Sequence, residues 1–294
     1  MSPCCTPLPA VRHKALQDAL PRARRALRLG GLTVMAAGVI SAPPVQAEEG
    51  AARVEGAVGL LVRQGPSFAG SRDDVLRVSP AGFLRVGRYT LTGSGGFTTV
   101  ADESVERGLA AEITRRGRLR MSLGLRMDRG RDAADDAGLA GLGDIRSTVR
   151  ARLAARWDPD DLWRVGAGIS VDALGRGQGA FGDVSVARRW GLGNGDSFWL
   201  AASVSAASRQ YLQVWHGVTA AQAAASGLPA FEAHAGLRDA HLSATWRAEY
   251  TLGGQRLGAY LGLDRSRLLG DAADSPITRR RGATALSAGM VWRF

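Results

Sequence analysis

Cysteine is almost absent from this sequence, and the two that occur, Cys4 and Cys5, are adjacent near the N-terminus. If the N-terminal segment is removed, the rest of the chain has no cysteine, which excludes a disulfide-stapled scaffold and a thiol enzyme. Long apolar runs are also missing beyond Ala47, where no stretch approaches the roughly 20 residues that a membrane-spanning helix needs. The chain after Ala47 is therefore expected either to be soluble or to cross a membrane as β-strands.

The first 47 residues have the layout of a secretory signal peptide. A basic cluster comes first, an apolar run over residues 29–42 follows, and small residues at 45–47 supply a cleavage site; the cluster consists of Arg22, Arg24, Arg25 and Arg28. The apolar run is too short and too rich in glycine for a membrane anchor. We therefore expect residues 1–47 to be a signal peptide and residues 48–294 to form the mature domain.

The chain is basic, with 38 Lys and Arg against 27 Asp and Glu and a formal net charge of +11. Part of this excess lies in residues 1–47, so the mature chain is less basic. An exported protein does not meet the genome, and the arginines of the mature chain are spread in alternation rather than clustered with aromatic residues. We therefore exclude nucleic-acid binding.

Apolar and polar residues alternate along several segments of the mature chain. Around residue 121, for example, Leu119, Met121 and Leu123 share one face while Arg120 and Ser122 share the other. A period of two indicates a β-strand, and the same pattern recurs at 118–128, 145–157, 163–173 and 241–250. These segments are longer than the roughly five or six residues usual in soluble sheets and match the roughly 9–11 of a tilted membrane strand.

Reading the whole chain in this way predicts an all-β fold, a transmembrane antiparallel up-and-down β-barrel of about 12 strands. The predicted strands lie near 53–63, 75–88, 89–99, 105–115, 118–128, 145–157, 162–173, 181–190, 197–207, 240–251, 256–266 and 283–294. Short connections alternate with long ones, as expected for a barrel with both termini in the periplasm. Aromatic residues near strand ends would form interfacial girdles; they are Trp157, Trp163, Trp190, Tyr250 and Trp292.

The end of the chain carries a second signal. The last strand places an apolar row on one face, namely Leu286, Ala288, Met290, Trp292 and Phe294. With a glycine at Gly289 and aromatic residues at Trp292 and Phe294, this segment resembles the signal that the barrel assembly machinery reads. A closing strand must pair on both sides, because an open edge in lipid leaves backbone groups without hydrogen bonds.

Four arginines share the inward face of the predicted strand 145–157 and would charge one wall of the lumen: Arg146, Arg150, Arg152 and Arg156. An open lumen with this charge would favour anionic solutes. Alternatively, the arginines pair with opposing acids such as Asp172, Asp183 and Glu249 and constrict the barrel, and we favour this second interpretation.

No pattern predicts a catalytic, cofactor-binding or metal-binding site. His241 and Ser243 share a strand face and resemble the His and Ser of outer-membrane acyl hydrolases, but they are expected to face the lumen, so an enzyme is a remote alternative. Three further patterns have simpler interpretations as loop residues, turns and a solvated acidic loop; they are His216 with His234, the glycine-rich segments 175–179 and 191–195, and Asp132 with Asp135 and Asp136.

Several segments of the mature chain resemble the MipA/OmpV family of Gram-negative outer-membrane proteins. Residues 66–71 (Pro-Ser-Phe-Ala-Gly-Ser) are similar to the first loop of that family, and residues 217–236 are similar to its longest loop. The most specific block is residues 268–277 (Leu-Leu-Gly-Asp-Ala-Ala-Asp-Ser-Pro-Ile). A departure occurs at His216, where the family usually has an aromatic or small residue.

The resemblance implies a non-catalytic scaffold in the cell outer membrane, surrounded by lipid and lipopolysaccharide. It further implies partners that remodel peptidoglycan, namely a murein transglycosylase and a peptidoglycan synthase, and no cofactor. The competing hypothesis is a channel or porin-like barrel for small anionic solutes. Planar-bilayer conductance and pull-down of murein hydrolases separate the two.

Overall fold

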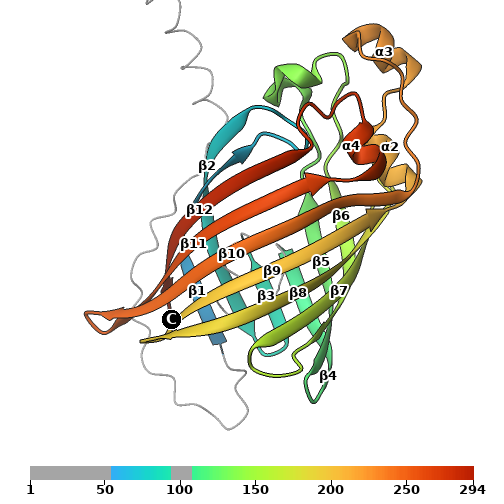
Figure 1. The fold of residues 1–294 in the computed structure, drawn as a ribbon. Helices are drawn as coiled ribbons and strands as arrows, with labels where there is room; N and C mark the ends of the chain where they lie inside the picture. The colour runs from blue at the N-terminus through green and yellow to red at the C-terminus, as the bar shows by residue number, and fades with distance from the viewer. Residues whose placement is uncertain (1–53, 94–107) are drawn as a thin grey trace, which may run out of the picture. The chain divides into compact units, whose positions relative to one another are not determined.

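The computed structural model of the protein describes residues 54–93 and 108–294. The predicted signal peptide, residues 1–47, lies outside the described residues. In the described part of the chain, twelve antiparallel strands close into a barrel in sequence order, which confirms the predicted fold class (Figure 1). The strands are β1 (Val54–Pro66), β2 (Asp74–Val86), β3 (Tyr89–Thr92), β4 (Gly108–Arg116), β5 (Leu119–Asp128), β6 (Thr148–Trp157), β7 (Trp163–Asp172), β8 (Ala180–Gly193), β9 (Asp196–Ala207), β10 (Gly236–Leu252), β11 (Gln255–Leu268) and β12 (Gly282–Arg293).

The barrel closes between its first and last strands. β12 pairs with β11 on one side and with β1 on the other, with Ala57 opposite Arg293 and Gln64 opposite Leu286. Beyond the last pair, the backbone amide of Gly56 donates to the carbonyl of Phe294 (3.1 Å) and the amide of Phe294 donates back (3.0 Å). Closure thus extends to the final residue and removes the open edge that lipid could not satisfy.

Glycine permits the close approach of the chain at this seam. A Cβ atom on Gly59 would lie 1.8 Å from the carbonyl oxygen of Met290, so no larger residue fits there without moving the strands apart. At Gly56, a Cβ would lie 2.4 Å from the ring of Phe294, so the ring occupies the space beside this glycine.

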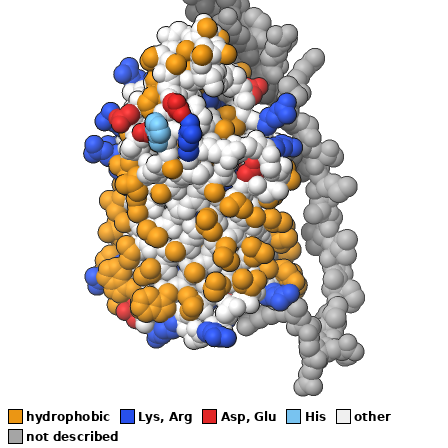
Figure 2. Space-filling view, turned by 90° about the vertical axis from the view of Figure 1, so that its right-hand side faces the viewer, with side chains coloured by type: hydrophobic (Ala, Val, Ile, Leu, Met, Phe, Trp, Pro, Cys, Tyr) orange, Lys and Arg blue, Asp and Glu red, His pale blue; other side chains and the backbone are white. Residues whose placement is uncertain are grey.

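The outer face of the barrel is apolar. Alternation puts leucine, valine and methionine on the outside of each strand, and Figure 2 shows them as a continuous band around the lower part of the visible face. Exposed examples are Leu60, Val78, Leu123, Ile169, Leu261 and Leu286. A soluble protein would bury such residues, whereas lipid accepts them. Separately, no helix in the described residues is long and apolar enough to cross a membrane.

The two ends of the barrel differ. Short hairpins, at 87–88, 117–118, 158–162, 194–195 and 253–254, lie at the end where β12 finishes, which we call the turn end. Long connections, including 129–147, 208–235 and 269–281, lie at the opposite, loop end. The five aromatic residues predicted for girdles all lie near the turn-end tips of their strands.

The long connections fold into a cap at the loop end. They contain two 3₁₀ turns and three helices, α2 (Arg209–His216), α3 (Ala220–Ser226) and α4 (Gly270–Asp274). Ser208 caps α2, and Thr219 with Gln222 forms a capping box on α3, so the sequence itself starts both helices. Sequence periodicity did not predict them, because each is only about two turns long.

Several predicted strand limits need correction; β10, for example, begins at Gly236 rather than at residue 240. β6 begins at Thr148 rather than at residue 145, so Arg146 lies exposed in the preceding loop and outside the inward row of that strand. The alternation of the sequence continues past the point where the chain leaves the sheet. β3 is described only over Tyr89–Thr92, and most of the predicted extension to residue 99 lies outside the described residues.

Candidate functional site

The inward face of β6 carries three arginines, Arg150, Arg152 and Arg156, and each has a carboxylate partner. Arg152 makes a two-pronged contact with Asp183 on β8, with N···O distances of 2.7 and 3.0 Å. Arg156 shares Asp158 with Arg164 of β7, each at 3.0 Å. These pairs lie along the wall between β6 and β8 and hold the side chains against it.

Arg150 lies deepest, with 1% of its surface exposed. Its Nε donates to Asp128 at 2.7 Å, and its guanidinium lies over the rings of Phe181 (5.3 Å) and Tyr211 (5.1 Å). Because Tyr211 belongs to α2, this arginine joins the barrel wall to the cap. Aromatic faces attract a guanidinium most strongly where water is excluded, which is the case here.

Of the three acids expected to pair with these arginines, one does so and two have other partners. Asp183 does pair with Arg152, as expected. Asp172 instead accepts from Thr148 (2.5 Å) and from the backbone amide of Gln178, and Glu249 pairs with Arg293 at 2.8 Å. The lumen wall is thus lined by ion pairs, and of the expected partners Asp183 is the one that pairs with an arginine of β6.

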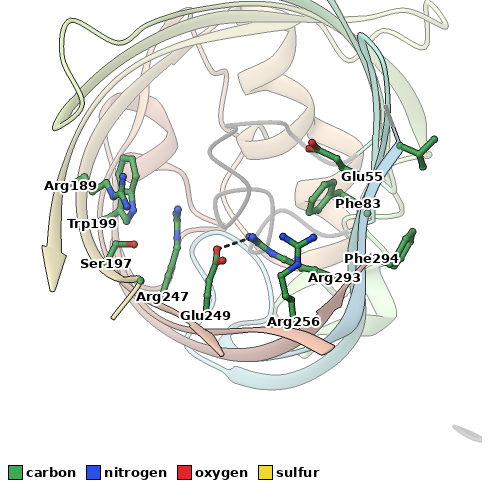
Figure 3. A pocket seen from close by; sticks show the side chains of 13 residues that line it. Glu55, Phe83, Arg189, Ser197, Trp199, Arg247, Glu249, Arg256, Arg293 and Phe294 are labelled. Atoms are coloured by element: carbon green, nitrogen blue, oxygen red, sulfur yellow. Dashed lines mark ion pairs between the residues drawn. The ribbon is translucent and has the colours of Figure 1, made fainter. Parts of the chain in front are cut away.

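A chamber of about 550 Å³ lies inside the turn end (Figure 3). It is lined by arginines from four strands, Arg189, Arg247, Arg256 and Arg293, together with Trp199, Ser197, Phe83, Glu55 and Glu249. Figure 3 shows Arg189, Trp199 and Arg247 on one part of the wall and Phe83 and Glu55 on the opposite part. Several charged groups thus converge on one concave space that also contains aromatic side chains, as polar groups do in many ligand sites.

Trp199 organises one wall of this chamber. Its ring, which is mostly buried, is approached by the guanidinium carbons of Arg164 (4.8 Å), Arg247 (5.0 Å) and Arg189 (6.0 Å). These three arginines come from β7, β10 and β8, on both sides of β9. The negative face of the indole offsets part of the repulsion among the like charges.

Sequence reasoning missed this cluster, although it identified each strand. Arg164, Arg189 and Arg247 each occur as one inward arginine of a separate strand, far apart in the chain. Their meeting depends on register, for example on the pairing of Arg189 with Trp199 and of Arg247 with Ser197. The short turns fix the register of each hairpin, and this register could have placed the three arginines beside Trp199.

The cap brings together the three segments that carry the family resemblance. Residues 66–71, 217–236 and 268–277 lie in different connections, yet an apolar cluster joins them: Phe68, Leu139, Leu142, Val218, Phe231 and Ile277. In a closed ring of strands, the connections after β1, β5, β9 and β11 are not all neighbours on the rim. Their mutual packing therefore runs across the mouth of the barrel.

Asp136 connects two of these connections by hydrogen bonds. Its carboxylate accepts from the hydroxyls of Ser67 and Ser71 (2.7 Å for Ser71) and from the backbone amide of Gly138 (2.8 Å). Burial would raise the pKa of Asp136, but these hydrogen bonds outweigh burial and lower it below its ordinary value. Asp136 thus acts in cap structure, and Asp132 likewise caps the adjacent 3₁₀ turn through the amide of Ala134.

His216, the residue that departs from the family pattern, is buried at the end of α2. Its pKa falls from 6.5 to about 4, mainly because the imidazole is buried and in addition because the positive charges of Arg131 and Arg238 are nearby. Its backbone carbonyl accepts from Ser275 at 2.5 Å, which joins α2 to the block at residues 268–277. It borders a second cavity of about 570 Å³ beneath the cap.

The remaining sequence candidates are a histidine and a serine on β10 and two glycine-rich segments. His241 lies 3.5 Å from Asp239, and within the described residues no hydrogen bond joins His241 to Ser243. Segment 175–179 is part of the loop between β7 and β8. In segment 191–195, residues 191–193 end β8, and Asn194 and Gly195 form the hairpin turn, with Asn194 in the left-handed region. No group of three or more potential metal ligands occurs in the part of the chain that the structure describes.

Comparisons with known proteins identify the family. Among solved structures, the NanC porin is similar at 8% identity, with 79% of this chain and 98% of that chain covered and a TM-score of 0.39. An outer-membrane channel from Pseudomonas putida F1 is 13% identical (86% and 99% covered, TM-score 0.36), and OmpT of Vibrio cholerae is 8% identical (85% and 99%, TM-score 0.35). Likenesses this distant carry no functional inference.

No curated relative matches the chain. The family model described as MltA-interacting protein MipA, however, matches residues 58–294, which is nearly the whole barrel. The matched region includes the C-terminal strand and all three cap segments. The chain belongs to the MipA family.

Proposed function

We propose that this protein is a non-catalytic scaffold in the cell outer membrane, with its turn end in the periplasm. The observation that carries the proposal is the cap, whose connections pack across the loop-end mouth through one apolar cluster and the Asp136 hydrogen bonds. A mouth filled by packed side chains is a poor route for solutes. Short periplasmic turns and long external loops give the orientation.

The family description names an interaction with MltA, a murein transglycosylase. By this kinship we infer that the present chain also binds a murein transglycosylase, and through it a peptidoglycan synthase. Both partners act on peptidoglycan, so they would meet the barrel at the periplasmic turn end. Their binding surface must therefore be built from strand tips and short hairpins.

The β10–β11 hairpin offers such a surface. β10 pairs with β9 only as far as Arg247, whereas its pairing with β11 continues to Leu252. Residues 248–252 therefore extend past β9, and Figure 1 shows this hairpin projecting from the turn end. Tyr250 and Leu252 on it are 49% and 71% exposed. A projecting strand with a free edge and apolar side chains is a surface to which a partner can add a strand.

The test measures binding of purified murein transglycosylase to the protein in detergent. We expect saturable binding that the double substitution Tyr250→Ser with Leu252→Ser weakens by roughly tenfold or more, because exposed apolar anchors dominate such interfaces. Leu192→Ser is the matched control, since Leu192 is also exposed but lies in the β8–β9 hairpin. Equal weakening by the control would reject the hairpin as the binding surface.

The channel hypothesis is tested with the same preparation in planar bilayers. A scaffold with a packed cap is expected to give no steady conductance. Steady anion-selective conductance, together with no binding of the transglycosylase, would overturn the scaffold proposal.

A further inference from the structure

The turn-end chamber has a composition that a purely structural lumen does not need. Arg189 and Arg256 both line it, and within the described residues neither forms an ion pair with a carboxylate. Elsewhere in the lumen the rule is different, since Arg150, Arg152 and Arg164 each have a carboxylate within 3.0 Å. The chamber is thus where the positive charge of the lumen exceeds the negative.

The carboxylates of the chamber do not neutralise this excess of positive charge. Glu249 is taken by Arg293 at 2.8 Å, and Glu55 lies 3.8 Å from Arg85. The wall around Trp199 adds Arg247, whose guanidinium carbon lies 5.0 Å from the centre of the indole ring. Gathering guanidinium groups in a partly enclosed space costs free energy unless an anion balances them.

We propose that this chamber binds a small polyanion whose charges are carboxylate or phosphate groups. Binding would not depend on the murein transglycosylase, because the chamber is lined by inward side chains, among them Glu249 and Arg256 of the β10–β11 hairpin, whereas the exposed Tyr250 and Leu252 of that hairpin are not part of its lining. The chamber is lined by Gly195 of the β8–β9 hairpin and by Phe294 at the chain end, so its ligand enters from the turn end. Its volume, about 550 Å³, lies within the range of small-molecule sites.

The arrangement of the arginines favours more than one negative group. In Figure 3, Arg247 and Arg189 lie on one part of the wall beside Trp199, and Arg256 with Arg293 on another. A guanidinium presents a planar fork that fits one carboxylate or phosphate face at a time. A ligand with two or more anionic groups can satisfy both parts of the wall, and a monoanion can satisfy only one.

Calorimetric titration of the full-length protein, purified in an uncharged detergent at low ionic strength, tests this. The probes are inorganic tripolyphosphate, citrate and acetate. We expect saturable binding of tripolyphosphate or citrate and none of acetate at equal concentration; which of the first two binds more tightly identifies phosphate or carboxylate as the preferred group. Added salt weakens the binding. Absence of saturable binding by both polyanions overturns the proposal.

Variants locate the site. The double substitution Arg189→Gln with Arg256→Gln is expected to weaken binding by about ten- to a hundredfold, because hydrogen bonds to charged groups are lost. Arg126→Gln is the matched control, since Arg126 borders the other cavity, beneath the cap. Equal weakening by Arg126→Gln would show attraction to the general charge of the lumen and would overturn the chamber as a specific site.

A spectroscopic measurement distinguishes loss of the binding site from misfolding of a variant. Binding beside Trp199 should change tryptophan fluorescence, and Trp199→Phe should abolish the change while leaving calorimetric binding of the polyanion detectable. Retention of the full fluorescence change in Trp199→Phe would place the ligand elsewhere. Failure of the transglycosylase to bind leaves each of these outcomes unaffected, so the two proposals fail separately.

Discussion

Asp136 illustrates how one carboxylate can hold a cap together. It is buried, and its oxygens accept from Ser67, Ser71 and the amide of Gly138. Asp136→Ala would leave two hydroxyls without this partner and should destabilise the cap by about 1–3 kcal/mol. Hydrogen–deuterium exchange should then rise in residues 67–73 and 136–142, with the strands unchanged. Ser67→Ala should have a smaller effect, since Ser71 remains; unchanged exchange in Asp136→Ala would refute this role.

His216 gives the cap a pH dependence. Its folded pKa is about 4 against 6.5 in the unfolded chain, so the unfolded state binds the proton more readily. The cap is therefore fully stable above pH 6.5 and loses stability as the pH falls towards about 4, by roughly 3 kcal/mol in all. Exchange of the amides of α2, measured between pH 7 and 4 and corrected for intrinsic rates, should show this opening. His216→Gln should flatten the profile, and an equally steep profile in that variant would contradict the assignment.

Residue-level inference from the sequence succeeded where the period of two was enough. Alternation placed the arginines of strand 145–157 on one face, and the structure has Arg150, Arg152 and Arg156 on the inward side. It failed at Arg146, because a loop residue can continue an alternating pattern after hydrogen bonding to the neighbouring strand has ended. It also could not find Trp199 with its three arginines, since alternation gives the direction of a side chain but not its neighbours on other strands.

At the scale of elements, β12 is the strand on which closure depends. It pairs along both edges, and the ring of Phe294 covers Gly56 at the last pair. We predict that Gly289, Trp292 and Phe294 form the assembly signal. Phe294→Ala should reduce by severalfold the fraction of the protein that folds in the outer membrane. The substitution removes the ring that shields the last backbone pair, and it also removes the terminal aromatic residue that the assembly machinery recognises. The fraction is measured as heat-modifiable protein on unboiled gels.

The control for this prediction is Leu286→Ala. Leu286 belongs to the same outward row of β12 and is similarly exposed, but it lies at the other end of the strand. It should lower assembly little, and a reduction equal to that of Phe294→Ala would show that outward apolar area, rather than the terminal position, is what matters.

Strands and cap helices differed in how far the sequence revealed them. A strand such as β7 consists of ten residues that alternate in polarity, and the connections on both sides of it are short. The existence and the limits of such a strand can be predicted from the sequence. The helices of the cap are short, and they are stabilised by contacts between connections that are distant in sequence, such as Ser275 with His216 and Gln222 with Leu142. The family resemblance singled out these loop segments in the sequence. The structure shows that they pack on one another.

At the scale of the whole molecule, the cap and the lumen together determine whether solutes pass. The cap packs across the loop-end mouth, while the lumen below it is lined with arginine and opens at the turn end through the basic chamber. Replacing residues 209–234 by a short Gly-Ser linker would remove α2 and α3 from the mouth and leave every strand intact. We expect this variant to conduct in planar bilayers with preference for chloride over potassium, because the arginines favour anions, whereas the complete protein stays closed. Heat-modifiability of the variant confirms that the barrel has formed. A folded variant that does not conduct would place the constriction within the lumen wall instead of the cap, and a cation-selective one would contradict the charge assigned to that wall.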